Sequence, residues 1–107
     1  MGDLWEFPGG KKELQESIEI TIAREIREEL GIDIEVGKEL ISFYHSYSDR
    51  KLHFIVHLCK LNAGKPLPLS SQQIKWANID DLNSYPFPAA NLTIIRVLKE
   101  YLVFNKS

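Results

Sequence analysis

The sequence predicts a small domain of the α/β class, in which helices pack against a β-sheet. Aliphatic residues recur at helical spacing over residues 17–30, and apolar residues alternate with other residues over 51–61, as in a strand. A second amphipathic pattern covers residues 92–104 and predicts a C-terminal helix. A chain of 107 residues has the length of one domain, which we expect to span residues 1–107.

The first predicted helix covers residues 17–30. Ser17 is suited to cap its N-terminus, and Gly31 is suited to end it, because glycine adopts the left-handed conformation at helix ends without strain. Its aliphatic side chains lie four residues apart and therefore share one face. They are Ile18, Ile22, Ile26 and Leu30.

A β-hairpin is predicted after this helix. Strand-like stretches over residues 39–46 and 51–61 flank a turn at residues 47–50. A turn centred on Asp49 would place His45 and His53 opposite each other across the strands.

The remaining segments are shorter. Residues 4–7 have an extended pattern, and Pro8, Gly9 and Gly10 follow as a turn. Later in the chain, we expect a short strand over residues 74–79 and a turn-rich segment over residues 80–88.

Composition excludes several classes of function. The net charge is −2 and no basic tract is present, so the sequence does not predict binding to a nucleic acid polymer. No apolar run approaches the roughly 20 residues of a membrane helix. Cys59 is the single cysteine, which excludes an intrachain disulfide and favours a reducing, cytoplasmic location.

Three acidic residues of the first predicted helix share one side. Glu25, Glu28 and Glu29 stand at positions i, i+3 and i+4. Such carboxylates repel one another unless a cation or a base neutralises them, and their hard oxygen atoms suit Mg²⁺ or Mn²⁺. The alternative is an ordinary acidic helix, whose glutamates pair with Arg24 and Arg27.

The spacing around these acids forms a recognisable motif. Five residues separate Gly10 from Glu16, and seven separate Glu16 from Arg24. Residues 24–32 read Arg-Glu-Ile-Arg-Glu-Glu-Leu-Gly-Ile. This pattern resembles the Nudix box, GX5EX7REUXEEXGU with U aliphatic, over residues 10–32. The resemblance implies a Nudix-type α/β/α sandwich with a mixed sheet between helices. It also implies a metal-dependent hydrolase that cleaves a diphosphate linkage attached to a nucleoside or similar group.

Two flanking segments narrow the resemblance. Residues 4–11 and 87–91 are similar to those of the MutT-like branch, which hydrolyses 8-oxo-dGTP to a nucleoside monophosphate and pyrophosphate. The resemblance implies that Mg²⁺, or alternatively Mn²⁺, binds carboxylates together with the backbone carbonyl of Gly9. The implied carboxylates are Glu25, Glu28 and Glu29. Glu16 and Arg24 match box positions that support the loop and helix of this catalytic site, Arg24 by ion pairing.

The resemblance also implies four contacts with a nucleotide substrate. Lys11 matches a phosphate-contacting lysine, Phe7 would pack against the base, and Asn91 matches an asparagine that reads the purine edge. Arg50 lies where a base-proximal arginine occurs. Simpler interpretations stay open: Asn91 is also suited to cap the following helix, Phe7 to fill the core, and Lys11 to be a solvated loop charge.

Two departures from the family pattern affect these expectations. Family members carry further residues before the segment that starts at Leu4, including sheet strands and a substrate-contacting arginine. We therefore expect a chain shortened at its N-terminus, whose missing strands favour self-association. Ser70 stands where MutT-like proteins commonly place a glutamate, six residues before Trp76. A hydroxyl cannot supply that negative charge, so we expect weaker metal binding or slower turnover.

Three functions are compatible with these observations. The first is hydrolysis of oxidised purine nucleotides such as 8-oxo-dGTP. A second is the same reaction on another nucleotide, such as dCTP, another nucleoside triphosphate or ADP-ribose. A third is a truncated, catalytically impaired domain that binds nucleotides without turnover.

Overall fold

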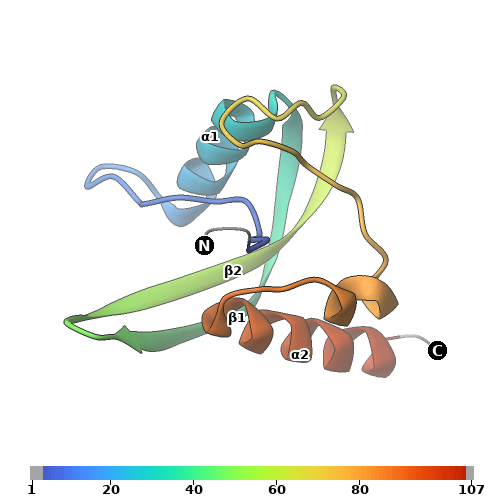
Figure 1. The fold of residues 1–107 in the computed structure, drawn as a ribbon. Helices are drawn as coiled ribbons and strands as arrows, with labels where there is room; N and C mark the ends of the chain where they lie inside the picture. The colour runs from blue at the N-terminus through green and yellow to red at the C-terminus, as the bar shows by residue number, and fades with distance from the viewer. Residues whose placement is uncertain (1–3, 106–107) are drawn as a thin grey trace. The chain divides into compact units, whose positions relative to one another are not determined.

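The computed structural model describes residues 4–105, which group into two compact units (Figure 1). The first unit contains residues 4–7, 39–56 and 77–105, and the second contains residues 8–38 and 57–76. The elements are, in chain order, α1 (Ile18–Leu30), β1 (Asp33–Tyr47), β2 (Arg50–Ala63), the 3-10 helix η1 (Ile79–Ser84) and α2 (Ala89–Phe104). Neither α1, η1 nor α2, the helices of residues 4–105, is long and apolar enough to cross a membrane.

Helix α1 forms the main element of the second unit and agrees with the prediction. The Ser17 hydroxyl accepts a hydrogen bond from the Ile20 amide at 3.1 Å, which caps the N-terminus. Gly31 ends the helix with φ 71°, and its N–H donates to the Arg27 carbonyl at 2.9 Å. Ile26 is buried on the apolar face. The acidic side chains of α1 therefore belong to a helix that is capped at both ends and packed on one face.

Strands β1 and β2 form a two-stranded sheet joined by a two-residue turn, and they are therefore antiparallel. Phe43 stacks on Phe54, and Tyr44 stacks on His53, with ring centroids 5.2 and 4.3 Å apart. The predicted pairing of His45 with His53 is therefore wrong by one residue. The turn comprises residues 48 and 49, so its centre lies between them and not on residue 49. Each residue of β1 therefore pairs with the residue of β2 one position earlier than predicted.

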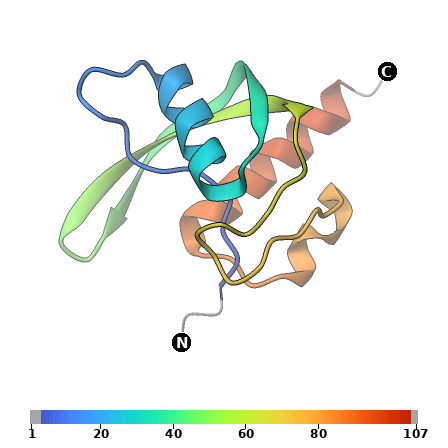
Figure 2. The same ribbon diagram turned by 90° about the horizontal axis from the view of Figure 1, so that it is seen from above.

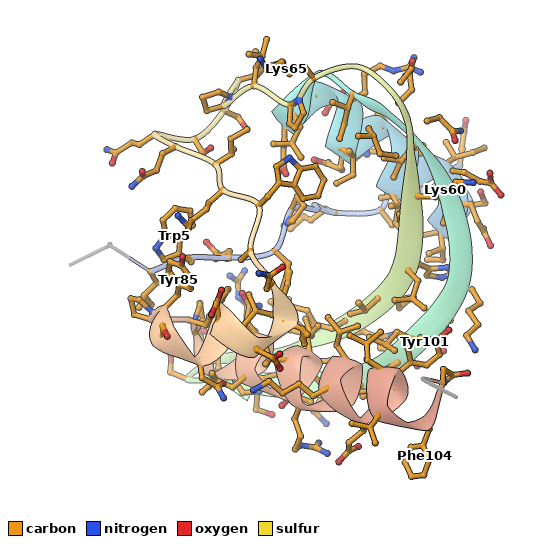
Figure 3. All side chains as sticks on the ribbon, turned by 90° about the vertical axis from the view of Figure 1, so that its right-hand side faces the viewer. Trp5, Lys60, Lys65, Tyr85, Tyr101 and Phe104 are labelled. Carbon is orange, nitrogen blue, oxygen red and sulfur yellow. The ribbon has the colours of Figure 1, made fainter. Side chains whose placement is uncertain are left out.

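The first unit joins residues 4–7 to the segment that precedes α2. The Trp5 N–H donates to the Pro86 carbonyl at 2.8 Å, and the Trp5 ring packs edge-on against Tyr85 (Figure 3). Phe7 stacks on Phe87, with ring centroids 5.5 Å apart. The buried side chains of η1 and α2 are Leu82, Ala90, Asn91, Ile94 and Ile95.

Two predicted elements differ from the structure. Residues 73–78 adopt neither helix nor strand, and Ile79 already belongs to η1, so the predicted strand over 74–79 is wrong. A strand needs a neighbour for its backbone groups, and the sheet of residues 4–105 contains only β1 and β2 rather than the expected mixed set. Helix α2 begins at Ala89, three residues earlier than its amphipathic pattern indicates.

Candidate active site

The loop of residues 8–16 runs beside α1, and Glu16 joins the two (Figures 1 and 2). Its carboxylate accepts hydrogen bonds from the Glu13 amide at 3.1 Å and from the Thr21 hydroxyl at 2.9 Å. Arg24 donates to both oxygens, from Nε at 2.6 Å and from Nη2 at 3.0 Å. The ion pair predicted for Arg24 is thus present, and it fixes the end of the loop on the helix.

The guanidinium of Arg24 also contacts two further acids. Its Nη1 donates to Glu25 Oε2 and to Glu28 Oε1, each at 3.1 Å, while Nη2 also donates to the Lys11 carbonyl at 3.3 Å. The hydrogen bonds with Glu16 raise the pKa of Arg24 further above its ordinary value. One permanently charged group therefore organises three carboxylates and the loop backbone.

This arrangement predicts how stability depends on pH. The hydrogen bond from Arg24, with smaller contributions from Glu13 and Thr21, lowers the pKa of Glu16 to about 2. A carboxyl whose pKa is depressed on folding stabilises the protein above its unfolded pKa, and this contribution is lost as the pH falls through the folded pKa.

We therefore expect Glu16→Gln to destabilise the protein at pH 7 and progressively less between pH 4.5 and pH 2. Urea unfolding of both proteins across this range measures the difference in free energy. A difference that did not change with pH would show that the Glu16 carboxylate is not held ionised by Arg24.

Two glycines bring the loop backbone against the carboxylates of α1. The Gly9 N–H donates to Glu29 Oε1 at 3.1 Å, with Gly9 at φ 153°, a conformation open to glycine. A Cβ atom at Gly10 would overlap the carboxylate of Glu25, whose carbon and two oxygens lie directly against this position. The loop approaches Glu25 this closely only because residue 10 has no side chain.

The donor set fits a hard divalent cation in its chemistry. Three carboxylates contact the single guanidinium of Arg24, which leaves an excess of two negative charges before Glu29 is counted. Oxygen donors with excess negative charge favour Mg²⁺ or Mn²⁺. Within residues 4–105, however, no three acidic, histidine or cysteine side chains converge on a common point. Nη1 of Arg24 donates instead to both Glu25 and Glu28.

A surface depression of about 350 Å³ follows the same helix. Its lining includes Arg24, Arg27 and Glu28 beside the apolar side chains of Ile20 and Ala23. Arg27 pairs with Asp33, its Nε lying 2.9 Å from Oδ1. The simpler interpretation, in which the glutamates pair with both arginines, is therefore confirmed for Arg24 and wrong for Arg27. Lys11 lies exposed in the neighbouring loop.

The other substrate-contact candidates belong to the first unit. Asn91 lies inside the first turn of α2, where Pro88 is the N-cap, so its interpretation as the helix cap is wrong. Its side chain is buried, with 7% of the residue exposed, and Oδ1 has no hydrogen-bond partner among residues 4–105. Phe7 packs on Phe87, and Arg50 is the exposed first residue of β2.

Two contacts of the candidate residues, one in each unit, carry little signal in the sequence. Thr21 is buried and donates to Glu16, a role signalled only by a polar residue among the aliphatic positions of α1. Phe87 supplies the ring on which Phe7 stacks. Phe87 lies in the segment before α2, and the sequence pattern does not indicate its partner.

Comparison with known proteins places these residues in a family. A NUDIX domain model matches residues 1–97. The 8-oxo-dGTP diphosphatase of Buchnera aphidicola subsp. Schizaphis graminum is 33% identical over 103 residues, covering 96% of this chain and 78% of that protein. The CTP pyrophosphohydrolase of Escherichia coli K12 is 33% identical over 92 residues, covering 86% and 68%.

Solved structures give the same result. The solution structure of the E. coli ORF135 protein matches with a TM-score of 0.77 and 29% identity, over 96% of this chain and 74% of that one. A MutT structure from a study of Aliivibrio salmonicida and Vibrio cholerae matches with a TM-score of 0.66 and 34% identity, over 94% and 78%. With its complete box and its Nudix-type α/β fold, the chain belongs to the Nudix family, as a MutT-like hydrolase of phosphoric anhydrides.

Proposed function

We propose that this protein is a Mg²⁺-dependent nucleoside triphosphate pyrophosphohydrolase that acts on oxidised purine nucleotides such as 8-oxo-dGTP. The products would be the nucleoside monophosphate and pyrophosphate. The observation that carries this proposal is the group of carboxylates around Arg24, which has excess negative charge and faces a glycine loop. The names of several relatives, 8-oxo-dGTP diphosphatase, support the choice of substrate.

Nudix hydrolases generally depend on divalent metal ions, and the residues of α1 have the chemistry for this. Glu25, Glu28 and Glu29, with the Gly9 carbonyl, would hold Mg²⁺ or Mn²⁺. A bound ion of this kind supplies a more acidic attacking water and offsets charge on the phosphates. Arg24 orients Glu25 and Glu28 through its Nη1.

The loop before α1 has two roles in this proposal. Glu16 and Arg24 hold its end on the helix, so the loop backbone keeps its place beside the carboxylates. Lys11 is exposed in the loop and its ammonium group would contact the phosphates. Both roles concern binding and orientation of the substrate.

Asn91 supports recognition of an oxidised purine. Its buried Oδ1 is an acceptor without a donor within residues 4–105, an arrangement that costs free energy unless a ligand supplies the donor. Oxidation of a purine at C8 places an N–H at N7, where ordinary guanine has only an acceptor. A site with an unpaired acceptor would therefore favour the oxidised base. Phe7 and Arg50 are the further base contacts that we propose.

A pyrimidine nucleotide is the second candidate substrate. The CTP pyrophosphohydrolase of E. coli is as similar in sequence as the first 8-oxo-dGTP diphosphatase described above. The amide of Asn91 has both donor and acceptor groups, which also match the edge of cytosine. Other nucleoside triphosphates, ADP-ribose and nucleotide binding without turnover are the remaining alternatives, the last because Ser70 replaces the expected glutamate.

Chromatographic analysis of reaction products tests these alternatives directly. The purified chain is incubated with Mg²⁺ and, separately, with 8-oxo-dGTP, dGTP, CTP, dCTP or ADP-ribose. We expect monophosphate and pyrophosphate to form preferentially from 8-oxo-dGTP, and no product without the metal. Faster turnover of CTP or dCTP would establish the second candidate, and a folded protein without turnover on any of them would indicate a nucleotide-binding domain.

We propose one Nudix domain that includes both compact units, since the family match extends over residues 1–97. Its partners would be nucleotides and not nucleic acid polymers or membranes. Self-association and a cytoplasmic location stay predictions of the sequence.

A further inference from the structure

The C-terminal end of α1 is bonded to a distant part of the chain. A helix leaves its last carbonyl groups without partners inside the helix. In this protein the Leu67 N–H donates to the Leu30 carbonyl at 2.9 Å, and the Leu69 N–H donates to the Glu29 carbonyl at 3.1 Å. The yellow segment after β2 in Figure 1 passes this end of the helix.

The sequence of this segment restricts which groups it offers. Residues 66–69 are Pro-Leu-Pro-Leu, here called the PLPL segment. Proline has no N–H, so Leu67 and Leu69 are its two amide donors, and both donate to α1. The Leu69 N–H is shared with the Leu67 carbonyl at 2.9 Å. Because proline also fixes its own φ and restricts the preceding residue, the segment loses little freedom when it binds.

Side-chain packing accompanies these hydrogen bonds. Gly31, which ends α1, lies against Leu69, whose Cδ1 would be 3.2 Å from a Cβ atom placed on the glycine. At Gly64, before the PLPL segment, a Cβ atom would be 3.3 Å from the Gly31 carbonyl oxygen. Backbone and side chains of residues 64–69 therefore meet the helix end directly.

Glu29 is held at two points as a result. Its carbonyl accepts from the Leu69 N–H, and its carboxylate accepts from the Gly9 N–H, each at 3.1 Å. Glu28 is the preceding residue on the same turn. The position of the last turn of α1, with two acids proposed to bind metal, is thus fixed by loops on both sides.

We propose that Leu67 and Leu69 are positioning residues for the metal-binding carboxylates of α1. Their amides hold the turn that carries Glu28 and Glu29. The two carboxylates are therefore already oriented when a cation binds. The inference rests on the proposed function, because it requires that α1 binds a divalent cation. Coupling of this kind is reciprocal: if the PLPL segment favours metal binding, metal binding strengthens the hydrogen bonds of the segment.

Amide hydrogen exchange of the unmodified chain, followed by NMR with and without saturating Mg²⁺, tests this coupling. Chemical shifts of the Glu28 and Glu29 amides report metal binding in the same sample. We expect exchange at Leu67 and Leu69 to slow at least about fivefold, the lower end of usual coupling between sites. The Trp5 amide, bonded to Pro86 in the other unit, is the control and should be unaffected.

The outcomes separate the two proposals. Binding of Mg²⁺ without slower exchange at Leu67 and Leu69 would overturn the positioning role and leave the enzymatic proposal intact. Absence of Mg²⁺ binding would overturn both. An equal effect at Trp5 would indicate general stabilisation and would also count against a specific role.

A pair of substitutions gives a second test. Leu69→Pro removes the amide donor, whereas Leu69→Ala keeps the donor and removes only the side-chain packing. We expect Leu69→Pro to weaken Mn²⁺ binding about tenfold, the size typical of groups that orient metal ligands, and Leu69→Ala to change it less than twofold. Equal Mn²⁺ affinity in two folded variants would contradict the role; if Leu69→Pro does not fold, exchange in the unmodified chain decides.

Discussion

Replacing Gly10 with alanine is expected to lower kcat/KM about 100-fold, the cost of displacing a catalytic group by roughly 1 Å. The new methyl group would overlap the Glu25 carboxylate, which is the end of a flexible side chain and can rotate away at the loss of its hydrogen bond with Arg24. Because the backbone need not move, we expect little change in thermal stability. Gly10→Ala is therefore expected to lower kcat/KM by displacing the Glu25 carboxylate and not by destabilising the fold.

Steady-state kinetics and thermal unfolding of the same samples measure this separation. Leu14→Ala is the matched control, since Leu14 lies in the same loop with 98% of its surface exposed and should alter neither quantity. Shortening the acid makes room for the methyl group, so Gly10→Ala combined with Glu25→Asp should be no slower than Glu25→Asp alone. Full activity of Gly10→Ala would show that the close approach of loop and carboxylate is unimportant for turnover.

Replacing Asn91 with leucine is expected to raise stability while removing selectivity for the oxidised base. Leucine has the same number of heavy side-chain atoms as asparagine but lacks the oxygen acceptor. Burying that acceptor without a partner costs about 1–3 kcal/mol, a cost that the substitution removes. For a chain of this size, 1 kcal/mol corresponds to about 4–8 °C in melting temperature. The preference for 8-oxo-dGTP over dGTP should fall by about 100-fold or more, because discrimination by a buried hydrogen-bonding group is lost.

Differential scanning calorimetry and competition between the two nucleotides provide the two measurements. Leu92→Ala, a change at the exposed neighbouring residue of α2, serves as the control and should leave selectivity unchanged. A large fall in stability of Asn91→Leu would mean that the asparagine has a structural role. Equal loss of activity on both nucleotides would remove Asn91 from base recognition.

Elements with strong local signals were predictable from the sequence. Helix α1 was predicted to within one residue because Ser17 and Gly31 mark its ends by their own chemistry. The strand over residues 74–79 was wrong because alternation of side chains says nothing about whether a partner strand is available. Trp76, within this segment, has 73% of its surface exposed and so lacks the packing of a side chain on a covered sheet.

In the candidate site, the sequence predicts which residues take part better than it predicts their contacts. Fixed spacing was enough to select Glu16 and Arg24, and their ion pair is present. The bridge from Arg24 to Glu28 depends on rotamers that spacing does not specify. Asn91 was ambiguous because the start of α2 was placed too late, which made a residue inside the helix resemble its cap.

The two-residue turn of the hairpin limits how this part of the chain can change during evolution. If one residue is inserted there, Phe54 still meets Phe43 only when the loop itself takes up the extra residue, as a three-residue loop with one residue in the left-handed conformation. A shift of the pairing by one residue would instead exchange the two faces of β2. Insertion of two residues preserves the faces and lengthens only the tip. Related sequences with one extra residue at this turn should therefore carry a glycine there, since glycine adopts the left-handed conformation of a three-residue loop without strain.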